Sequence, residues 1–286
     1  MGVYAVRVFQ RGQGEASHFW RSDDKVCLYS GSKTYTSLAI GICRDQGRLG
    51  LDDPVLGFFP EFRDQASPGS ETITLKNLLQ MASGKKEFWF AGDPDRKNTS
   101  DYAQLFFSDP MRGPAGAGFF YSNACTYMLS RVVEKVTGQT LRDFLVPALF
   151  TPLGIVNPQW HTCPRGHTLG ATELFLTNQE YSRLGRLLLD GGVYGDQRLV
   201  SEAYLREATS EWMDSSVQEE PESRLGYGYQ VWRCSPPGVY RADGLYGQFC
   251  VVFPDLQTVV TLTSHEEKSP NDLLRLVYND ILPLLG

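Results

Sequence analysis

Apolar residues follow a strand-like pattern at both ends of the chain. Residues 3–9 alternate between apolar and polar side chains, and a glycine-containing turn at 11–14 leads to a second short run near 18–20, which predicts a β-hairpin. Strand-like runs return late in the chain, at 227–232, 240–243, 249–253 and 258–263. Strands so far apart in sequence, with helices between them, indicate one antiparallel sheet built from distant segments.

The middle of the chain has apolar positions spaced three and four residues apart, as in amphipathic helices. The clearest example is residues 125–136, where Gly138 ends the helix. The predicted helices cover 30–47, 75–81, 124–136, 141–150 and 179–189, with a closing helix at 272–285. This order of elements predicts an α+β fold, in which helices flank a central antiparallel sheet.

The helical middle is expected to form an inserted domain that packs against the sheet. We place a discontinuous sheet domain at 1–55 plus 166–286 and a mainly helical domain at 56–165. A cleft between two such units is the natural place for a small-molecule site.

Composition narrows the class of protein. The 286 residues are 42% hydrophobic and 21% charged with a net charge of -6, which is ordinary for a globular protein and argues against a nucleic-acid partner. No apolar run is long enough to span a bilayer. The first seven residues read as a strand without the features of a signal peptide, so we expect a cytoplasmic protein unless an upstream segment has been removed.

Cysteine and histidine positions do not indicate a disulfide framework or a metal site. None of the six cysteines forms a Cys-x-x-Cys pair, and most lie in apolar runs. His161, Cys163 and His167 are irregularly spaced in a polar loop. We therefore expect no metal and no cofactor.

Ser-x-x-Lys occurs three times, beginning at Ser22, Ser30 and Ser83, but only Ser30 opens a periodic helix after a short apolar strand. Ser30 and Lys33 then share one helix face, one turn apart. A serine becomes a nucleophile when a base is held against it, and a lysine serves as that base only when it is neutral. The structural alternative is an N-cap serine followed by an exposed lysine.

Two further segments carry candidate chemistry. Tyr121 and Asn123 lie just before the helix at 124–136, where a phenol can relay a proton and an amide can bind a substrate. The bend at Gly244 lets the backbone approach a substrate carbonyl, so the N–H of Leu245 and the N–H of Ser30 can form an oxyanion hole. Taken singly, these segments are typical of an N-cap and a turn.

In this order and context, the segments resemble the serine-reactive family of class C β-lactamases, D-alanyl-D-alanine peptidases and related family VIII-type esterases. Similar stretches are spread along the chain, at 30–40, 47–55, 73–84, 120–123, 136–138 and 152–155. The resemblance implies the β-lactamase/transpeptidase-like fold. It also implies that Ser30 is acylated, that Lys33 accepts its proton alone or through Tyr121, and that Asn123 orients Lys33 and the substrate.

The third segment departs from the family pattern of Lys or His, then Thr or Ser, then Gly. This chain has Ala242-Asp243-Gly244, so the cation is missing and Asp243 would repel an acidic substrate. Strand alternation places Arg241 on the face opposite Ala242, so it does not obviously replace the cation. Alternatively Leu245-Tyr246-Gly247 is the match, which would put Tyr246 at the family's histidine position. The expected substrate-binding residues are Asn123, Asp243, Gly244, Leu245 and Tyr246.

These observations favour a serine hydrolase with a Ser30–Lys33–Tyr121 acyl-enzyme mechanism on a small ester or amide. A β-lactamase or D-alanyl-D-alanine carboxypeptidase is the main alternative, with a β-lactam or peptide as substrate. A catalytically silent binding or sensor protein of the same fold is a third hypothesis. A Ser-His-Asp hydrolase using His265 is the least favoured, since no Gly-x-Ser-x-Gly elbow is present.

Overall fold

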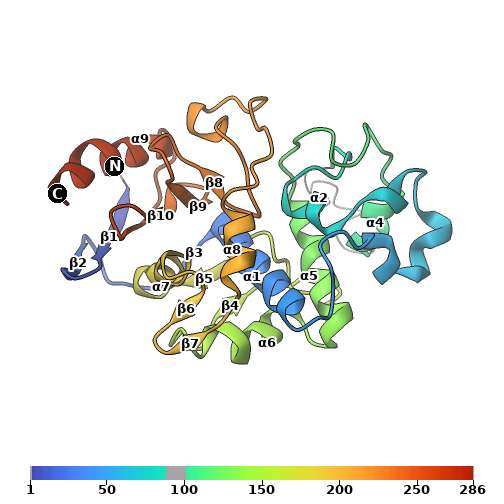
Figure 1. Cartoon of the computed structure of the whole chain (residues 1–286), viewed down its shortest axis with the longest axis horizontal. Helices are drawn as coiled ribbons and strands as arrows, with labels where there is room; N and C mark the ends of the chain where they lie inside the picture. Colours follow the sequence, from blue (N-terminus) through green and yellow to red (C-terminus); the bar gives the residue numbers. More distant parts are fainter. Residues whose placement is uncertain (1, 88–100, 286) are drawn as a thin grey trace.

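A six-stranded antiparallel sheet joins the two ends of the chain in the computed structural model, which describes residues 2–87 and 101–285 (Figure 1). Its order is β2-β1-β11-β10-β9-β8. The strands are β1 (Val3–Gln10), β2 (Gly14–Phe19), β8 (Trp232–Arg233), β9 (Tyr240–Gly244), β10 (Gln248–Phe253) and β11 (Thr258–Ser264). Because β1 pairs with β11, the prediction of a sheet built from distant segments is confirmed.

Helices cover both faces of this sheet, so its central strands are buried on both sides. Helix α7 (Asn178–Leu189) packs on one face of β10 and β11, and Gly185 allows the close approach, because a Cβ there would collide with Val259. Helix α9 (Pro270–Leu276) covers the other face, where Val251 and Val260 join a second apolar core. The predicted closing helix at 272–285 continues from α9 only as a π-helical turn at Val277–Ile281 and a 3₁₀ turn at Leu282–Leu284.

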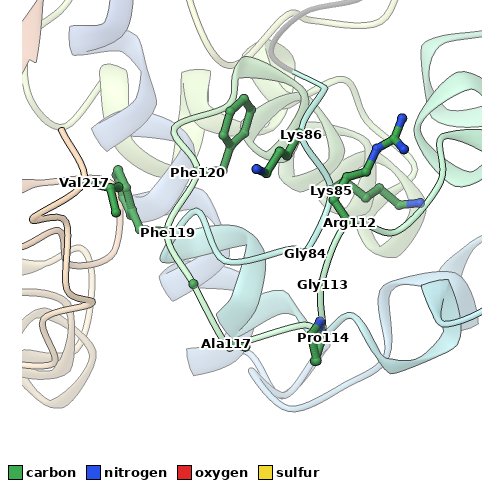
Figure 2. A pocket seen from close by; sticks show the side chains of 11 residues that line it. Gly84, Lys85, Lys86, Arg112, Gly113, Pro114, Ala117, Phe119, Phe120 and Val217 are labelled. Atoms are coloured by element: carbon green, nitrogen blue, oxygen red, sulfur yellow. The ribbon is translucent and has the colours of Figure 1, made fainter. Parts of the chain in front are cut away.

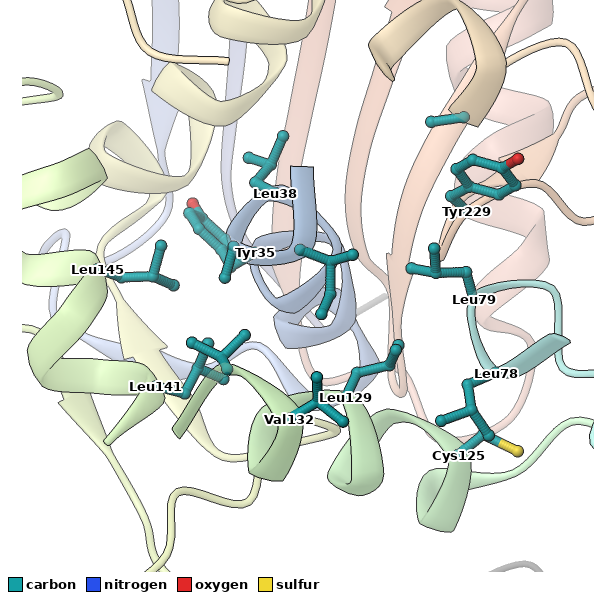
Figure 3. Close-up of a cluster of buried hydrophobic side chains, with 14 of the residues drawn as sticks. Tyr35, Leu38, Leu78, Leu79, Cys125, Leu129, Val132, Leu141, Leu145 and Tyr229 are labelled. Atoms are coloured by element: carbon teal, nitrogen blue, oxygen red, sulfur yellow. The ribbon is translucent and has the colours of Figure 1, made fainter. Parts of the chain in front are cut away.

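Helix α1 (Ser32–Asp45) lies between the sheet and the helical region, with apolar residues on several sides (Figure 3). Tyr35 and Leu38 of α1 share the core with Leu129 of α5 (Asn123–Thr137). Further helices surround this pair: α2 (Leu75–Leu79), α4 (Tyr102–Ser108), α6 (Leu141–Leu145), the π-helical turn Val146–Phe150 and α8 (Glu202–Ala208). In Figure 1 the sheet occupies one end of the molecule, and α2 and α4 occupy the other. The domain boundaries at 55/56 and 165/166 stay a prediction.

Capping residues explain why most predicted helix bounds are close to the observed ones. Thr177 and Glu180 form a capping box at the start of α7, and Gly138 ends α5 with φ +73°. The strand predicted at 227–232 is wrong for most of its length, since only Trp232 of that range enters β8. Gln230 there has φ +64°, which is incompatible with an extended strand.

Several short elements lie outside the sequence prediction. They are β5 (Leu174–Leu176) and β4 (Gln159–Trp160), a hairpin of β6 (Val193–Tyr194) and β7 (Gln197–Arg198), and helix α8. β5 and β4 form a three-stranded sheet with β3 (Val26–Cys27), the short strand predicted before Ser30. The 3₁₀ turns lie at Tyr29–Gly31, Val55–Phe58, Pro60–Gln65, Ser70–Thr72 and Pro221–Ser223. The β3–β5 pairing bears on function, because it anchors the segment that leads to Ser30.

Candidate active site

Ser30 lies in a 3₁₀ turn between β3 and α1. The backbone N–H of Leu28 donates to the carbonyl of Leu174 over 2.8 Å, which fixes the approach to the turn. Tyr29 has φ +46°, a left-handed backbone that an aromatic residue rarely adopts. Gly31 is required because a Cβ there would lie 2.8 Å from the hydroxyl oxygen of Tyr181. The surrounding structure therefore holds Ser30 in a tightly constrained turn.

Lys33 is buried and its amine contacts three oxygens. Its Nζ lies 2.9 Å from Ser30 Oγ, 2.6 Å from Asn123 Oδ1 and 2.8 Å from the carbonyl oxygen of Ala171. Burial lowers the pKa of Lys33 to about 7, although the nearby Asp243 carboxylate acts in the opposite direction. A substantial share of Lys33 is then neutral at neutral pH and has a lone pair for the Ser30 proton.

Tyr121 and Asn123 reach the site from the start of α5. Ser122 caps this helix by accepting from the N–H of Cys125 over 3.3 Å, which places Asn123 in the first turn. Burial raises the pKa of Tyr121, while a hydrogen bond with Ser30 opposes the increase. The Tyr121 ring stacks on Trp232, with centroids 5.5 Å apart. The phenol is therefore protonated at neutral pH and can donate a hydrogen bond.

Strand β9 brings the third segment against the turn that holds Ser30. A Cβ on Gly244 would collide with the carbonyl oxygen of Leu28, so this close approach requires glycine. Ala242 faces the apolar core, and Leu245 follows the strand with its side chain 54% exposed.

Arg241 and Asp243 share the other face of β9 and form an ion pair. Arg241 Nε donates to Asp243 Oδ2 over 2.8 Å, and Arg241 is fully buried. Burial raises the pKa of Asp243, and the Arg241 guanidinium opposes that increase. Strand alternation predicted that Arg241 would lie opposite Ala242. Residues two apart share a strand face, so Arg241 and Asp243 can form an ion pair, which the sequence analysis did not predict.

These segments enclose a cavity of about 440 Å³. It is lined by Tyr29, Ser30, Tyr121, Asn123, Thr172, Gln218, Ser223, Trp232, Asp243 and Leu245. Tyr246 is not among the lining residues, because its backbone has φ +66° and its ring packs on His265, with centroids 4.3 Å apart. The structure thus brings Ser30, Lys33, Tyr121, Asn123, Asp243 and Leu245 together, with Gly244 behind them, and it places Tyr246 outside the cavity.

A second cavity of about 310 Å³ is lined by sequence neighbours of two residues that line the first (Figure 2). Val217 and Phe120 line it, and their sequence neighbours Gln218 and Tyr121 line the first cavity. In Figure 2 the Lys86 side chain lies beside Phe120, whereas Lys85 and Arg112 extend away from Phe119. The second cavity is therefore adjacent to the site but holds none of its Ser–Lys–Tyr group.

Sequence reasoning missed several contributors to the site, among them Ala171, Trp232 and Gln218. Ala171 contributes a backbone carbonyl, Trp232 an aromatic wall for Tyr121, and Gln218 part of the cavity lining. A backbone acceptor leaves no side-chain signal in a sequence. Trp232 was assigned to a strand, with no indication that its ring would face the site.

Other candidate groups lie elsewhere. His161 pairs with Glu173 and His167 with Glu134, each with a shortest contact of 2.8 Å. Within the described ranges no group of three or more His, Cys, Asp or Glu side chains is placed to hold a metal ion, and no helix has the length and apolar character to cross a membrane. All six cysteines have free thiols.

Comparison with known proteins agrees with the observed fold. A model of the Beta-lactamase family matches residues 3–282. A penicillin-binding protein from Bacillus halodurans has the same fold, with a TM-score of 0.75 and 18% identity over 97% of this chain and 95% of that one. These findings define the class as proteins of the β-lactamase/penicillin-binding type. The chain belongs to the Beta-lactamase family, which confirms the resemblance read from its motifs.

Relatives within this family have hydrolase names. Lovastatin esterase of Penicillium rubens is 31% identical over 193 residues, which are 59% of this chain and 48% of that protein. The 6-aminohexanoate-dimer hydrolase of Paenarthrobacter ureafaciens is 25% identical over 283 residues, which are 89% of this chain and 70% of that protein. The chain thus matches about half the length of the first relative and more than two thirds of the second.

Proposed function

We propose that the chain is a serine hydrolase that cleaves a small ester or amide through an acyl-enzyme on Ser30. The observation that carries this proposal is that Ser30 Oγ, in a residue that lines the cavity, lies 2.9 Å from the buried Lys33 amine, whose pKa is lowered to about 7. A neutral amine in hydrogen-bond contact with a hydroxyl is the arrangement that general-base activation of serine needs.

Acylation begins when Lys33 Nζ takes the proton of Ser30 and Oγ attacks the substrate carbonyl carbon. The backbone N–H groups of Ser30 and Leu245 stabilise the oxyanion of the tetrahedral intermediate. The bond to the leaving group then breaks, and the leaving group takes the proton that Lys33 accepted, relayed by Tyr121. Because burial raises the pKa of Tyr121, the phenol acts in its protonated form, so we assign the base to Lys33.

Deacylation repeats these steps with water as the nucleophile. Water loses a proton to Lys33 or, through Tyr121, to the same base, and attacks the acyl carbon. The ester bond to Ser30 breaks, Ser30 regains its proton and the acid leaves. Asn123 keeps Lys33 oriented through the 2.6 Å contact and presents its N–H₂ group to the substrate.

Intact-mass analysis after treatment with a fluorophosphonate tests this proposal. We expect one adduct on the wild-type protein and none on Ser30→Ala, whereas Ser22→Ala, in the exposed Ser-x-x-Lys sequence, keeps the adduct. Wild-type protein that remains unmodified would contradict the nucleophile assignment and favour the binding or sensor hypothesis.

The main alternative is a penicillin-recognising enzyme, a β-lactamase or D-alanyl-D-alanine carboxypeptidase. Parallel treatment with benzylpenicillin tests it. A stable penicillin adduct on Ser30, or penicillin hydrolysis that Ser30→Ala abolishes, would favour this alternative. We expect neither, because Asp243 lines the cavity where the family usually carries a cation and a hydroxyl for an acidic substrate.

A further inference from the structure

The charge and the aromatic lining of the cavity point to its substrate class. We propose that the site selects esters or amides that carry a positively charged ammonium group, and that Asp243 is the residue that binds this cation. The inference rests on the proposed hydrolase function and adds a substrate preference to it.

Asp243 is the one charged side chain among the described residues that line the cavity. Its side chain keeps 21% exposure, whereas its partner Arg241 has none. Arg241 holds Oδ2, and no hydrogen bond from another described residue engages Oδ1. A bound substrate therefore meets the carboxylate and not the guanidinium.

The immediate surroundings of Asp243 carry a net negative charge. Arg241 Nη1 also lies 3.9 Å from Glu222 Oε2, so one guanidinium faces two carboxylates. Lys33, the other cation near Asp243, has a pKa of about 7 and carries only part of a charge at neutral pH. An entering cation is attracted to this group, and an anion is repelled.

Aromatic side chains complete the environment that a cation requires. Tyr29, Tyr121 and Trp232 line the same cavity as Asp243. Tyr121 and Trp232 stack on each other, and Lys33 Nζ lies 4.9 Å from the Tyr121 centroid. An entering ammonium group therefore contacts Tyr29 and the uncovered parts of the other two rings. Leu245 adds an apolar wall, which suits the methyl groups of a substituted ammonium better than the hydration shell of a metal ion.

Three p-nitrophenyl esters of matched size test this inference. The cationic ester is that of 4-(trimethylammonio)butanoic acid, the neutral isostere that of 5,5-dimethylhexanoic acid, and the anionic one the glutaric acid monoester. We expect kcat/KM to be about tenfold higher for the cationic than for the neutral ester, the factor of a partly buried ion pair with an aromatic contact. The anionic ester is expected to be the poorest.

The Asp243→Asn variant is expected to reduce the ratio of cationic to neutral kcat/KM about tenfold, to near one. Asp214→Asn is the matched control, because Asp214 is exposed, lies outside the cavity and should leave the ratio unchanged. On wild-type protein, added NaCl should reduce kcat/KM for the cationic ester and leave the neutral ester unaffected. This salt measurement holds even if Asp243→Asn does not fold.

Two outcomes would overturn the cation preference alone: neutral or anionic esters cleaved as well as the cationic one, or a preference that survives Asp243→Asn. Failure to cleave any of the three esters, with no fluorophosphonate adduct, would instead contradict the proposed hydrolase function and this inference with it.

Discussion

Within residues 2–87 and 101–285, two buried lysines contact serine hydroxyls, and they differ in what surrounds the serine. Lys33 contacts Ser30, which lines a cavity, and Asn123. Lys85 contacts Ser67 and Ser70 at 3.0 Å each and the carbonyl of Asp109. Burial lowers the pKa of both amines, to about 7 for Lys33 and about 8 for Lys85.

The two clusters differ in whether a substrate can reach the serine hydroxyl and in which other polar groups surround that hydroxyl. Ser70 is fully buried, and neither Ser70 nor Ser67 lines the cavity beside Lys85, so no substrate carbonyl reaches those hydroxyls there. Ser30 has a cavity, a phenol and an amide around it. A Ser–Lys contact with a lowered lysine pKa is therefore insufficient to indicate catalysis. The Lys85 cluster instead has a structural role, in which hydrogen bonds link neighbouring loops.

The sharpest way to break this comparison is to remove each amine in turn. Lys33→Met should lower kcat/KM for an ester by at least about 10³-fold, because Ser30 loses its base. Lys85→Met should change kcat/KM by no more than a few fold. Both variants are measured with the neutral p-nitrophenyl ester. Equal losses in the two variants would show that the clusters are not functionally distinct.

Removal of the phenolic hydroxyl tests a partner that only the Ser30 cluster has. Tyr121→Phe keeps the ring that stacks on Trp232 and loses the proton relay. We expect kcat to fall about 10²-fold with little change in KM. Steady-state kinetics on the same ester give both constants. Wild-type kcat in this variant would exclude Tyr121 from proton transfer.

Lys85→Met should instead affect stability. The substitution leaves two serine hydroxyls and a carbonyl without their shared donor, and we expect the free energy of unfolding to fall by about 2 kcal/mol, or about 30-fold in the folding equilibrium. Urea denaturation followed by circular dichroism provides the measurement. An unchanged midpoint would argue against a structural role.

The pH dependence of activity also distinguishes Lys33 from Lys85, although the expected change in rate is smaller. Because the neutral form of Lys33 is the base, kcat/KM should rise with pH through about 7 and level off above it. At pH 6 we expect a rate about tenfold below the plateau, since about one amine in ten is neutral there. Lys85→Met should keep this profile. A flat profile between pH 6 and 8 would contradict general-base catalysis by Lys33.

Local sequence signals were sufficient for much of the fold. The predicted helices at 124–136 and 179–189 agree with α5 and α7 to within one residue at each end, because caps such as Gly138 and Thr177 are local features. The strand predicted at 227–232 failed because its apolar pattern is interrupted by Gln230 in a left-handed conformation, which the pattern alone does not reveal.

The residues of the candidate site likewise divide into those that the sequence predicted and those that it did not. Ser30 and Lys33 share a helix turn, so their spacing placed them together, and the family resemblance added Tyr121 and Asn123. The Ala171 carbonyl could not be found, because any residue type presents the same backbone oxygen. Only the packing of Gly244 against Leu28 shows how closely β9 approaches Ser30, since that distance depends on the tertiary fold.

The pairing of β1 with β11 delays the completion of the six-stranded sheet during synthesis. Partners such as Arg7 and Thr261 are more than two hundred residues apart, so β1 can pair with β2 early but acquires its second neighbour only after β11 has left the ribosome. The turn that holds Ser30 is likewise incomplete until Gly244, which packs against this turn, has been synthesised. A nascent chain that has not yet reached residue 244 therefore carries Ser30 without the strand that packs against its turn, so any activity appears only after this strand has been synthesised.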